Sequence, residues 1–237
     1  MREHLLILAI ITPVGLTAQA APSPVGGTLD VGYVSSAGNS SVQTFSLGQA
    51  LTWKASARLT AREQLRSIYG EADNKVNANS LNIGVWADYT VFDGVGATAG
   101  AEFERNRFAG IAQRTRELAG ATWHVNAPRD SIRVDAGGVW TQQRSTLDST
   151  TDFTSLRAAL VIKHVLGAGA SFQEAVEVLP NLDNHADWQL NSESAIVAPL
   201  SRRLGLKAAY VVKYDNLPEP TFKTTDRILT AGLQITF

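Results

Sequence analysis

The chain has 237 residues, is 44% hydrophobic and carries a formal net charge of -1 from 21 basic and 22 acidic residues. This balance gives no support to nucleic-acid binding through bulk charge, and we expect no nucleic-acid partner. The sequence contains no cysteine, which excludes a disulfide framework and thiolate metal sites. The apolar residues beyond the N-terminus are dispersed by alternation, as the wall of a β-barrel requires.

The first twenty residues have the features of a secretory signal peptide. Arg2 supplies a positive charge, residues 5–16 form an apolar stretch, and Ala18-Gln19-Ala20 is a small-x-small cleavage site. An apolar stretch of about 12 residues is shorter than the ~20 that a spanning helix needs. We therefore expect cleavage after Ala20 and a mature domain of residues 21–237. An uncleaved interfacial helix is the alternative interpretation.

Period-2 alternation then recurs along the whole mature chain. In the clearest case Leu81 and Ile83 share one face while Asn82 lies on the other, and Asp93-Gly94 forms a tight hairpin turn at the end of the same strand. Such alternation places one face against an apolar medium and the other against water or polar groups. The expected strands are residues 29–34, 45–53, 59–69, 80–91, 95–106, 114–125, 132–140, 155–163, 172–178, 188–199, 206–214 and 225–237.

The last expected strand organises the prediction of the fold. Leu229 and Leu233 lie on one face, Thr230 and Gln234 lie on the other, and the strand stops on the aromatic Phe237. In a barrel the last strand pairs with the first, because closure removes the unpaired edges. The sequence therefore predicts an all-β fold, a transmembrane antiparallel up-and-down β-barrel of about 12 strands.

Loop lengths and aromatic positions support the same topology. Short turns near residues 54–56, 93–94, 126–130 and 167–169 alternate with longer polar loops such as 70–77 and 144–152. Outer-membrane barrels place short turns on the periplasmic side and longer loops outside. Aromatic residues near strand ends resemble interfacial girdles; they are Tyr33, Trp53, Tyr69, Tyr89, Trp123, Trp140, Trp188 and Tyr214.

Two glutamates do not fit the pattern. Glu63 and Glu174 fall on the outward phase near the middle of their strands, where a charge in lipid is costly. Three explanations remain open at this point: a local bulge, a misplaced strand boundary, or contact of these faces with another polar surface.

Motifs near both ends of the mature chain resemble one bacterial family. They are Gly32-Tyr33 with Gly38-Asn39-Ser40, and then Tyr214, Asn216, Pro218, Lys223, Thr225-Asp226 and Gly232-Leu233 up to Phe237. This pattern is similar to that of salt-induced outer membrane proteins, a domain family of unknown function. The resemblance implies an outer-membrane β-barrel and no activity, cofactor or catalytic residue.

Charged residues on the inward phase are the candidate functional residues. Strands at 95–106 and 114–125 carry opposite charges and lie ~4.8 Å apart if they are neighbours, so their long side chains can pair. Such residues either form a charged pore constriction or partly close the lumen with stabilising salt bridges. The predicted lumen-lining residues are Arg62, Arg66, Glu102, Glu104, Arg114, Arg116, Arg133, Asp135, Lys207 and Lys213. Glu177 and Glu193 fall on the same inward phase.

Evidence for an enzyme is thin. His124 follows Thr122 on the same face, and His164 and His185 lie elsewhere without the clustered spacing of a catalytic or metal site. Polar loops carry acidic residues that suit Ca²⁺ or divalent bridges to lipopolysaccharide, although a solvated polar loop is the preferred explanation; these residues are Glu71, Asp73, Asp148, Asp152 and Asp183. We expect no catalytic residue, no metal site and no cofactor.

We therefore predict a bacterial outer-membrane protein that acts as a small, weakly selective diffusion channel or as a structural protein of envelope stress. Its expected partners are outer-membrane lipid, lipopolysaccharide and the barrel-assembly machinery, the last through the strand that ends at Phe237. The alternatives are a lipid-modifying enzyme of the outer membrane and a soluble periplasmic β-sandwich binding protein. A closed barrel keeps compact mobility on a gel in cold detergent, and a sandwich does not.

Overall fold

The computed structural model describes residues 24–36, 42–73 and 75–237. The expected signal peptide and the turn at Gly38-Asn39 lie outside these residues. The described chain forms a closed barrel in which each strand pairs antiparallel with its sequence neighbours. The strands are β1 (Val25–Ser36), β2 (Val42–Lys54), β3 (Leu59–Ala72), β4 (Lys75–Phe92), β5 (Val95–Asn106), β6 (Ile111–Asn126), β7 (Asp130–Ser145), β8 (Thr150–Val165), β9 (Ser171–Pro180), β10 (Trp188–Pro199), β11 (Leu204–Asp215) and β12 (Thr225–Thr236).

Pairing of the first and last strands closes the barrel. Thr28 on β1 stands opposite Thr236 on β12, and Gly32 stands opposite Gly232. The backbone of Gly27 exchanges hydrogen bonds of 2.9 and 3.1 Å with that of Phe237. No sheet edge therefore remains at this seam, and the predicted up-and-down barrel of 12 strands is confirmed.

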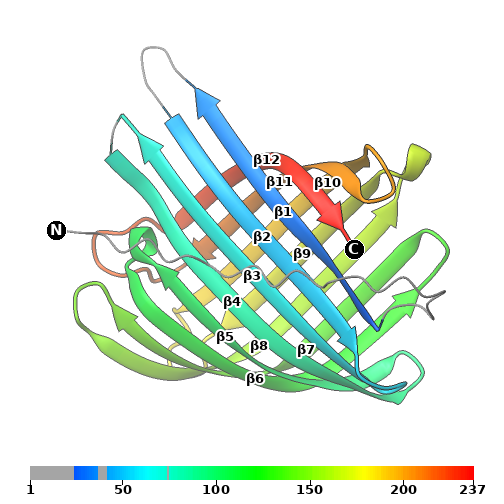
Figure 1. The fold of residues 1–237 in the computed structure, drawn as a ribbon. Helices are drawn as coiled ribbons and strands as arrows, with labels where there is room; N and C mark the ends of the chain where they lie inside the picture. Colours follow the sequence, from blue (N-terminus) through cyan, green and yellow to red (C-terminus); the bar gives the residue numbers. More distant parts are fainter. Residues whose placement is uncertain (1–23, 37–41, 74) are drawn as a thin grey trace.

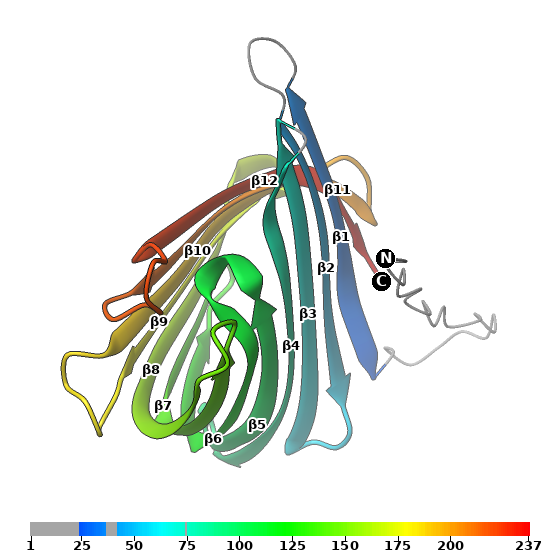
Figure 2. The same cartoon turned by 90° about the vertical axis from the view of Figure 1, so that its left-hand side faces the viewer.

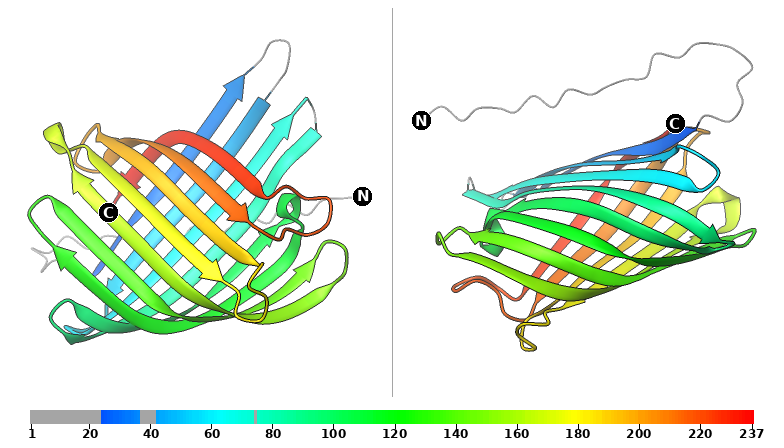
Figure 3. Two further views of the ribbon diagram at one scale, coloured as in Figure 1. Left: turned by 180° about the vertical axis from the view of Figure 1, so that it is seen from behind. Right: turned by 90° about the horizontal axis from the view of Figure 1, so that it is seen from below.

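The strands are strongly tilted and wrap around a central space (Figures 1 and 3). Figure 2 shows β1–β4 as one wall and β9–β12 as the facing wall, joined through β5–β8. Two 3-10 segments, η1 (Arg107–Ala109) and η2 (Gly167–Gly169), lie in connections between strands. Within the described part of the chain, no helix has the length and apolarity needed to span a bilayer.

The two ends of the barrel differ in their connections. The terminal end, as we call it, holds the starts of β1 and β11 and tight turns such as the one at Gly94, whose φ of 72° suits glycine. The opposite loop end holds η1 and the connections 181–187 and 216–224. The predicted loops 70–77 and 144–152 are wrong in extent: β3 continues to Ala72 and β8 begins at Thr150. These strands extend into the polar segments because polar side chains do not prevent backbone hydrogen bonding between neighbouring strands.

The outer face of the barrel is apolar in its middle. Large hydrophobic side chains such as Val85, Leu156, Leu206 and Leu229 point outward and are exposed. A monomeric soluble protein rarely exposes such a continuous apolar surface. The outer face thus matches the lipid-facing band of an outer-membrane-type barrel.

The two outward glutamates do not lie at bulges. The register of β3 against β2 and β4 is continuous around Glu63, and that of β9 against β10 is continuous around Glu174. Each carboxylate accepts hydrogen bonds from neighbouring strands: Gln49 Nε2 donates to Glu63 at 3.1 Å, and the hydroxyls of Ser192 and Ser194 donate to Glu174. The bulge explanation is therefore wrong, and local polar partners reduce the cost of these two charges.

Candidate functional site: the charged lumen

Polar side chains of the inward phase gather in the lumen. A cavity of about 280 Å³ is lined by residues of β3 through β12. Eight of the ten residues predicted to line the lumen border this cavity, namely Arg62, Arg66, Glu102, Glu104, Arg116, Arg133, Asp135 and Lys213. Arg114 and Lys207 line smaller neighbouring cavities. Alternation along the strands therefore brings the whole predicted set into one interior.

The first ion-pair network crosses the barrel near the loop end. Lys213 Nζ on β11 lies 2.6 Å from Glu104 Oε1 on β5, and Arg114 Nη1 lies 3.2 Å from Glu104 Oε2. Arg116 lies 3.6 Å from Glu102 and also donates a 2.7 Å hydrogen bond to Gln189 on β10. Glu104, Arg114 and Arg116 are buried. These contacts connect opposite walls, so they narrow the lumen at this level.

The second network lies nearer the terminal end, on strands β3 to β9. Asp88 accepts hydrogen bonds from both Arg62, at 2.5 Å, and Arg133, at 2.9 Å. Arg133 also pairs with Asp135, which lies 3.4 Å from Arg157. Arg157 Nε also lies 2.6 Å from Glu177 Oε2 on β9, so the network of ion pairs continues to that strand. Each buried charge in this network therefore has a partner of opposite sign, as a low-dielectric interior demands.

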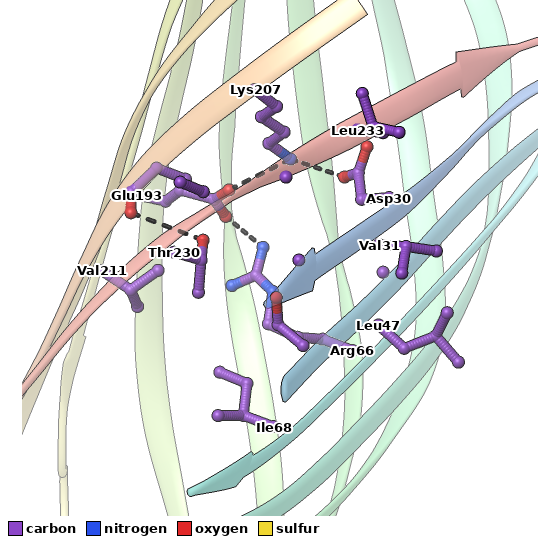
Figure 4. A pocket seen from close by; sticks show the side chains of 16 residues that line it. Asp30, Val31, Leu47, Arg66, Ile68, Glu193, Lys207, Val211, Thr230 and Leu233 are labelled. Carbon is purple, nitrogen blue, oxygen red and sulfur yellow. Dashed lines mark hydrogen bonds and ion pairs between the residues drawn. The ribbon is translucent and has the colours of Figure 1, made fainter. Parts of the chain in front are cut away.

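The third network lies at the seam where β1 pairs with β12, and it links strands on both sides of that seam (Figure 4). Arg66 on β3 pairs with Glu193 on β10. Lys207 on β11 lies between Glu193, at 3.7 Å, and Asp30 on β1, at 2.6 Å. Gln234 donates a further hydrogen bond of 2.8 Å to Asp30. Figure 4 shows the side chains of Arg66 and Lys207 pointing toward Glu193, with Lys207 also pointing toward Asp30.

A loop covers part of the mouth at the loop end. In the connection 216–224, Glu219 accepts a 2.8 Å hydrogen bond from Gln143 on β7. A Cβ added to Gly110, just before β6, would lie 2.7 Å from Glu219 Cβ and 3.0 Å from Phe222 Cδ2. The loop therefore packs on the η1 turn, as the adjacent connections at one side of Figure 1 also show. A vestibule of about 330 Å³ remains between this loop and 181–187.

Several residues of the networks were absent from the predicted set. They are Asp30, Asp88, Gln143, Arg157 and Gln189. All of them lie on the inward phase of their strands, so alternation alone places them in the lumen. Their partners lie on strands distant in the sequence, and no spacing rule identifies such partners.

The histidines do not converge on a site. His164 Nδ1 lies 2.7 Å from Asp130 Oδ1 in an exposed pair at the terminal end. Among the hydrogen bonds of residues 24–36, 42–73 and 75–237, no serine or threonine hydroxyl is joined to a histidine. The same part of the chain contains no group of three His, Asp or Glu side chains placed to hold a metal ion.

Solved outer-membrane barrels share this fold at low sequence identity. The NanC porin matches with a TM-score of 0.55 and 10% identity, over 88% of this chain and 100% of that chain. An outer membrane channel from Pseudomonas putida F1 matches with a TM-score of 0.53 and 11% identity, over 94% and 100%. The translocator domain of the autotransporter NalP from Neisseria meningitidis matches with a TM-score of 0.51 and 14% identity, over 90% and 87%. These likenesses show a porin-like barrel architecture.

Sequence comparison identifies the family. The uncharacterized protein YdiY of Escherichia coli (strain K12) is 26% identical over 226 residues, which are 90% of this chain and 84% of that protein. The model of a family described as "Protein of unknown function, DUF481" matches residues 29–237. The resemblance of the terminal motifs to an outer-membrane family of unknown function is thereby confirmed. The chain belongs to the DUF481 family of proteins of unknown function.

Proposed function

We propose that the protein is a narrow diffusion channel of the bacterial outer membrane, with a lumen constricted by ion pairs. The observation that carries this proposal is a cavity of about 280 Å³, lined by charged side chains, inside a closed barrel with an apolar outer face. A barrel of 12 strands is wider than one of about 8, whose interior side chains just fill. The bridges Lys213–Glu104 and Arg66–Glu193 reduce that space. We therefore expect small solutes and a low conductance.

Conductance of the refolded mature protein in a planar bilayer tests this function. We expect discrete steps of small size in the native protein and larger steps in Lys213→Ala, because that change removes the side chain that spans the lumen. Heat-modifiable gel mobility checks that each protein is folded before insertion. Stable insertion without steps in both proteins would contradict the channel and leave a structural role, which the buried Glu104–Arg114–Arg116 group would then support.

The cellular setting forms part of the same proposal. Export through residues 1–20, residence among outer-membrane lipid and lipopolysaccharide, and assembly through β12 all agree with the exposed apolar band. Sequencing the N-terminus of protein from purified outer membranes tests both the location and cleavage after Ala20. Recovery in the soluble periplasmic fraction would contradict this setting.

We also propose that the protein is not an enzyme. The exposed His164–Asp130 pair has no hydroxyl partner among its hydrogen bonds in the described chain, and nucleophilic catalysis needs a nucleophile within hydrogen-bond reach of its base. Phospholipid hydrolysis by the native protein and by His164→Gln tests this point. Turnover that the substitution abolishes would contradict the proposal.

A further inference from the structure

We propose that the central cavity takes small anions in preference to cations, and that Arg62, Arg66 and Lys213 determine this preference. The inference rests on the proposed channel function and names its substrate class: small anions such as chloride, carboxylates and phosphate. Each of the three cationic side chains lines the cavity. They come from β3 and β11, so they face the cavity from different sides of the barrel.

Net charge alone does not produce this preference. The ionisable side chains that line the cavity are nearly balanced, with six basic residues (Arg62, Arg66, Arg116, Arg133, Arg157 and Lys213) and five acidic ones (Glu102, Glu104, Asp135, Glu177 and Glu193). A count of charges therefore predicts a weakly selective lumen. The preference comes from which member of each ion pair reaches the open space.

In the pairs that Arg62, Arg66 and Lys213 form, the cation is more exposed than its carboxylate. Arg133, which also lines the cavity, has the same bias, with 21% against 9% for Asp135. The exposed side-chain fractions are 29% for Lys213 against 5% for Glu104, and 29% for Arg62 against 12% for Asp88. For Arg66 and Glu193 they are 28% and 16%. The opposite bias is smaller, at 4 to 5 percentage points; it occurs in Arg157–Glu177, Arg116–Glu102 and Lys207–Asp30.

This asymmetry changes what a solute in the cavity meets. An anion can touch the free donors of Arg62, Arg66 or Lys213 and form charge-assisted hydrogen bonds. A cation finds carboxylates such as Glu104 behind their own partners, at a greater distance, and Coulomb energy falls with distance. The arginine fork suits carboxylate and phosphate oxygens in particular. The cavity surface is therefore cationic although its lining is close to neutral.

Exchanging the members of an ion pair tests the inference without changing composition or net charge. We expect the native protein in a KCl gradient to show a chloride-to-potassium permeability ratio above one. In Arg66→Glu/Glu193→Arg, and independently in Lys213→Glu/Glu104→Lys, we expect the ratio to fall below the native value. The milder Arg66→Gln/Glu193→Gln should also lower it, because the exposed cation is removed at constant net charge.

The matched control is the exchange Asp130→His/His164→Asp. This exposed pair at the terminal end does not line the cavity, so we expect the native ratio. Heat-modifiable gel mobility shows which variants fold. Where an exchange variant does not fold, Arg66→Gln/Glu193→Gln is measured in its place. A native ratio at or below one would overturn the inference, as would exchanges at both cavity-lining pairs that leave the ratio unchanged.

A second measurement does not depend on conduction. Trp86 lines the cavity, and the Arg62 guanidinium lies 5.2 Å from its ring centroid. Because the two ions quench free indole with different efficiencies, the quenching constant of Trp86, isolated as the difference between native protein and Trp86→Phe, is divided by that of N-acetyltryptophanamide with the same ion. We expect this normalised constant to be larger for iodide than for caesium. An equal or larger normalised constant for caesium would overturn the anion preference. Preferential iodide quenching without any conductance would contradict the channel function and leave the anion site standing.

Discussion

Lys213 on β11 and Glu104 on β5 form an ion pair of 2.6 Å although five strands lie between them in either direction around the barrel. The two strands therefore lie on opposite walls, and this contact spans the lumen. Glu104 also lies 3.2 Å from Arg114 and 3.8 Å from Arg116. One buried carboxylate thus lies within ion-pair distance of three cations.

The first prediction concerns this carboxylate. Glu104→Gln should lower the free energy of unfolding by about 3–5 kcal/mol, because it leaves buried cations without their partner. Urea unfolding in lipid vesicles measures the change. Asp130→Asn is the control, since the exposed Asp130–His164 pair should contribute only about 0–1 kcal/mol. Similar losses in both variants would contradict a structural role for Glu104.

The second prediction concerns the loop 216–224. In Gln143→Cys/Glu219→Cys, a short thiol-reactive crosslinker should hold the loop against β7 and reduce the channel conductance, because the native side chains already meet there at 2.8 Å. The chain has no other cysteine, so the reaction is specific. Each single cysteine variant treated with the same reagent is the control. Unchanged conductance after complete crosslinking would show that the loop lies outside the solute path.

The third prediction concerns the outward carboxylate at Glu63. Glu63→Leu/Gln49→Leu should raise the free energy of unfolding by up to about 2 kcal/mol, because a glutamate facing lipid costs less than the ~2–4 kcal/mol of a lysine or arginine. Glu117→Leu is the control. Glu117 lies opposite Trp140, one of the aromatic residues expected in an interfacial girdle, where the cost of a charge is smaller. Unfolding in vesicles should therefore show a larger gain for the first variant.

Alternation was sufficient to predict the strands and the phase of the charged residues. Lys213 and Glu104 were both assigned to the lumen because each lies on the inward phase of its own strand. Closure followed from the last strand, and the β1–β12 register then places Gly32 opposite Gly232. The strands and the face on which each side chain lies could be predicted because both depend only on residues that are adjacent in the sequence.

The ion-pair partners could not be predicted in the same way. Lys213 and Glu104 are 109 residues apart in the sequence, and Arg66 and Glu193 are 127 apart. Which side chains meet depends on the stagger of all twelve strands, a property of the closed sheet. The local polar partners of Glu63 were missed for a related reason, because Gln49 lies on the neighbouring strand.

The fourth prediction concerns the glycine beneath Trp86. A Cβ on Gly84 would lie 2.2 Å from Trp86 Cη2 and 2.6 Å from Cζ2. Gly84→Ala should therefore push the indole into the cavity and lower the free energy of unfolding by about 1–3 kcal/mol, as overpacking does. Gly138→Ala is the control, since its added Cβ meets nothing within 4 Å. In a Trp86→Ala background the cost of Gly84→Ala should disappear, because the three atoms nearest to the added Cβ all belong to the ring. A cost that persists there would mean that the strand backbone, rather than the indole, requires glycine.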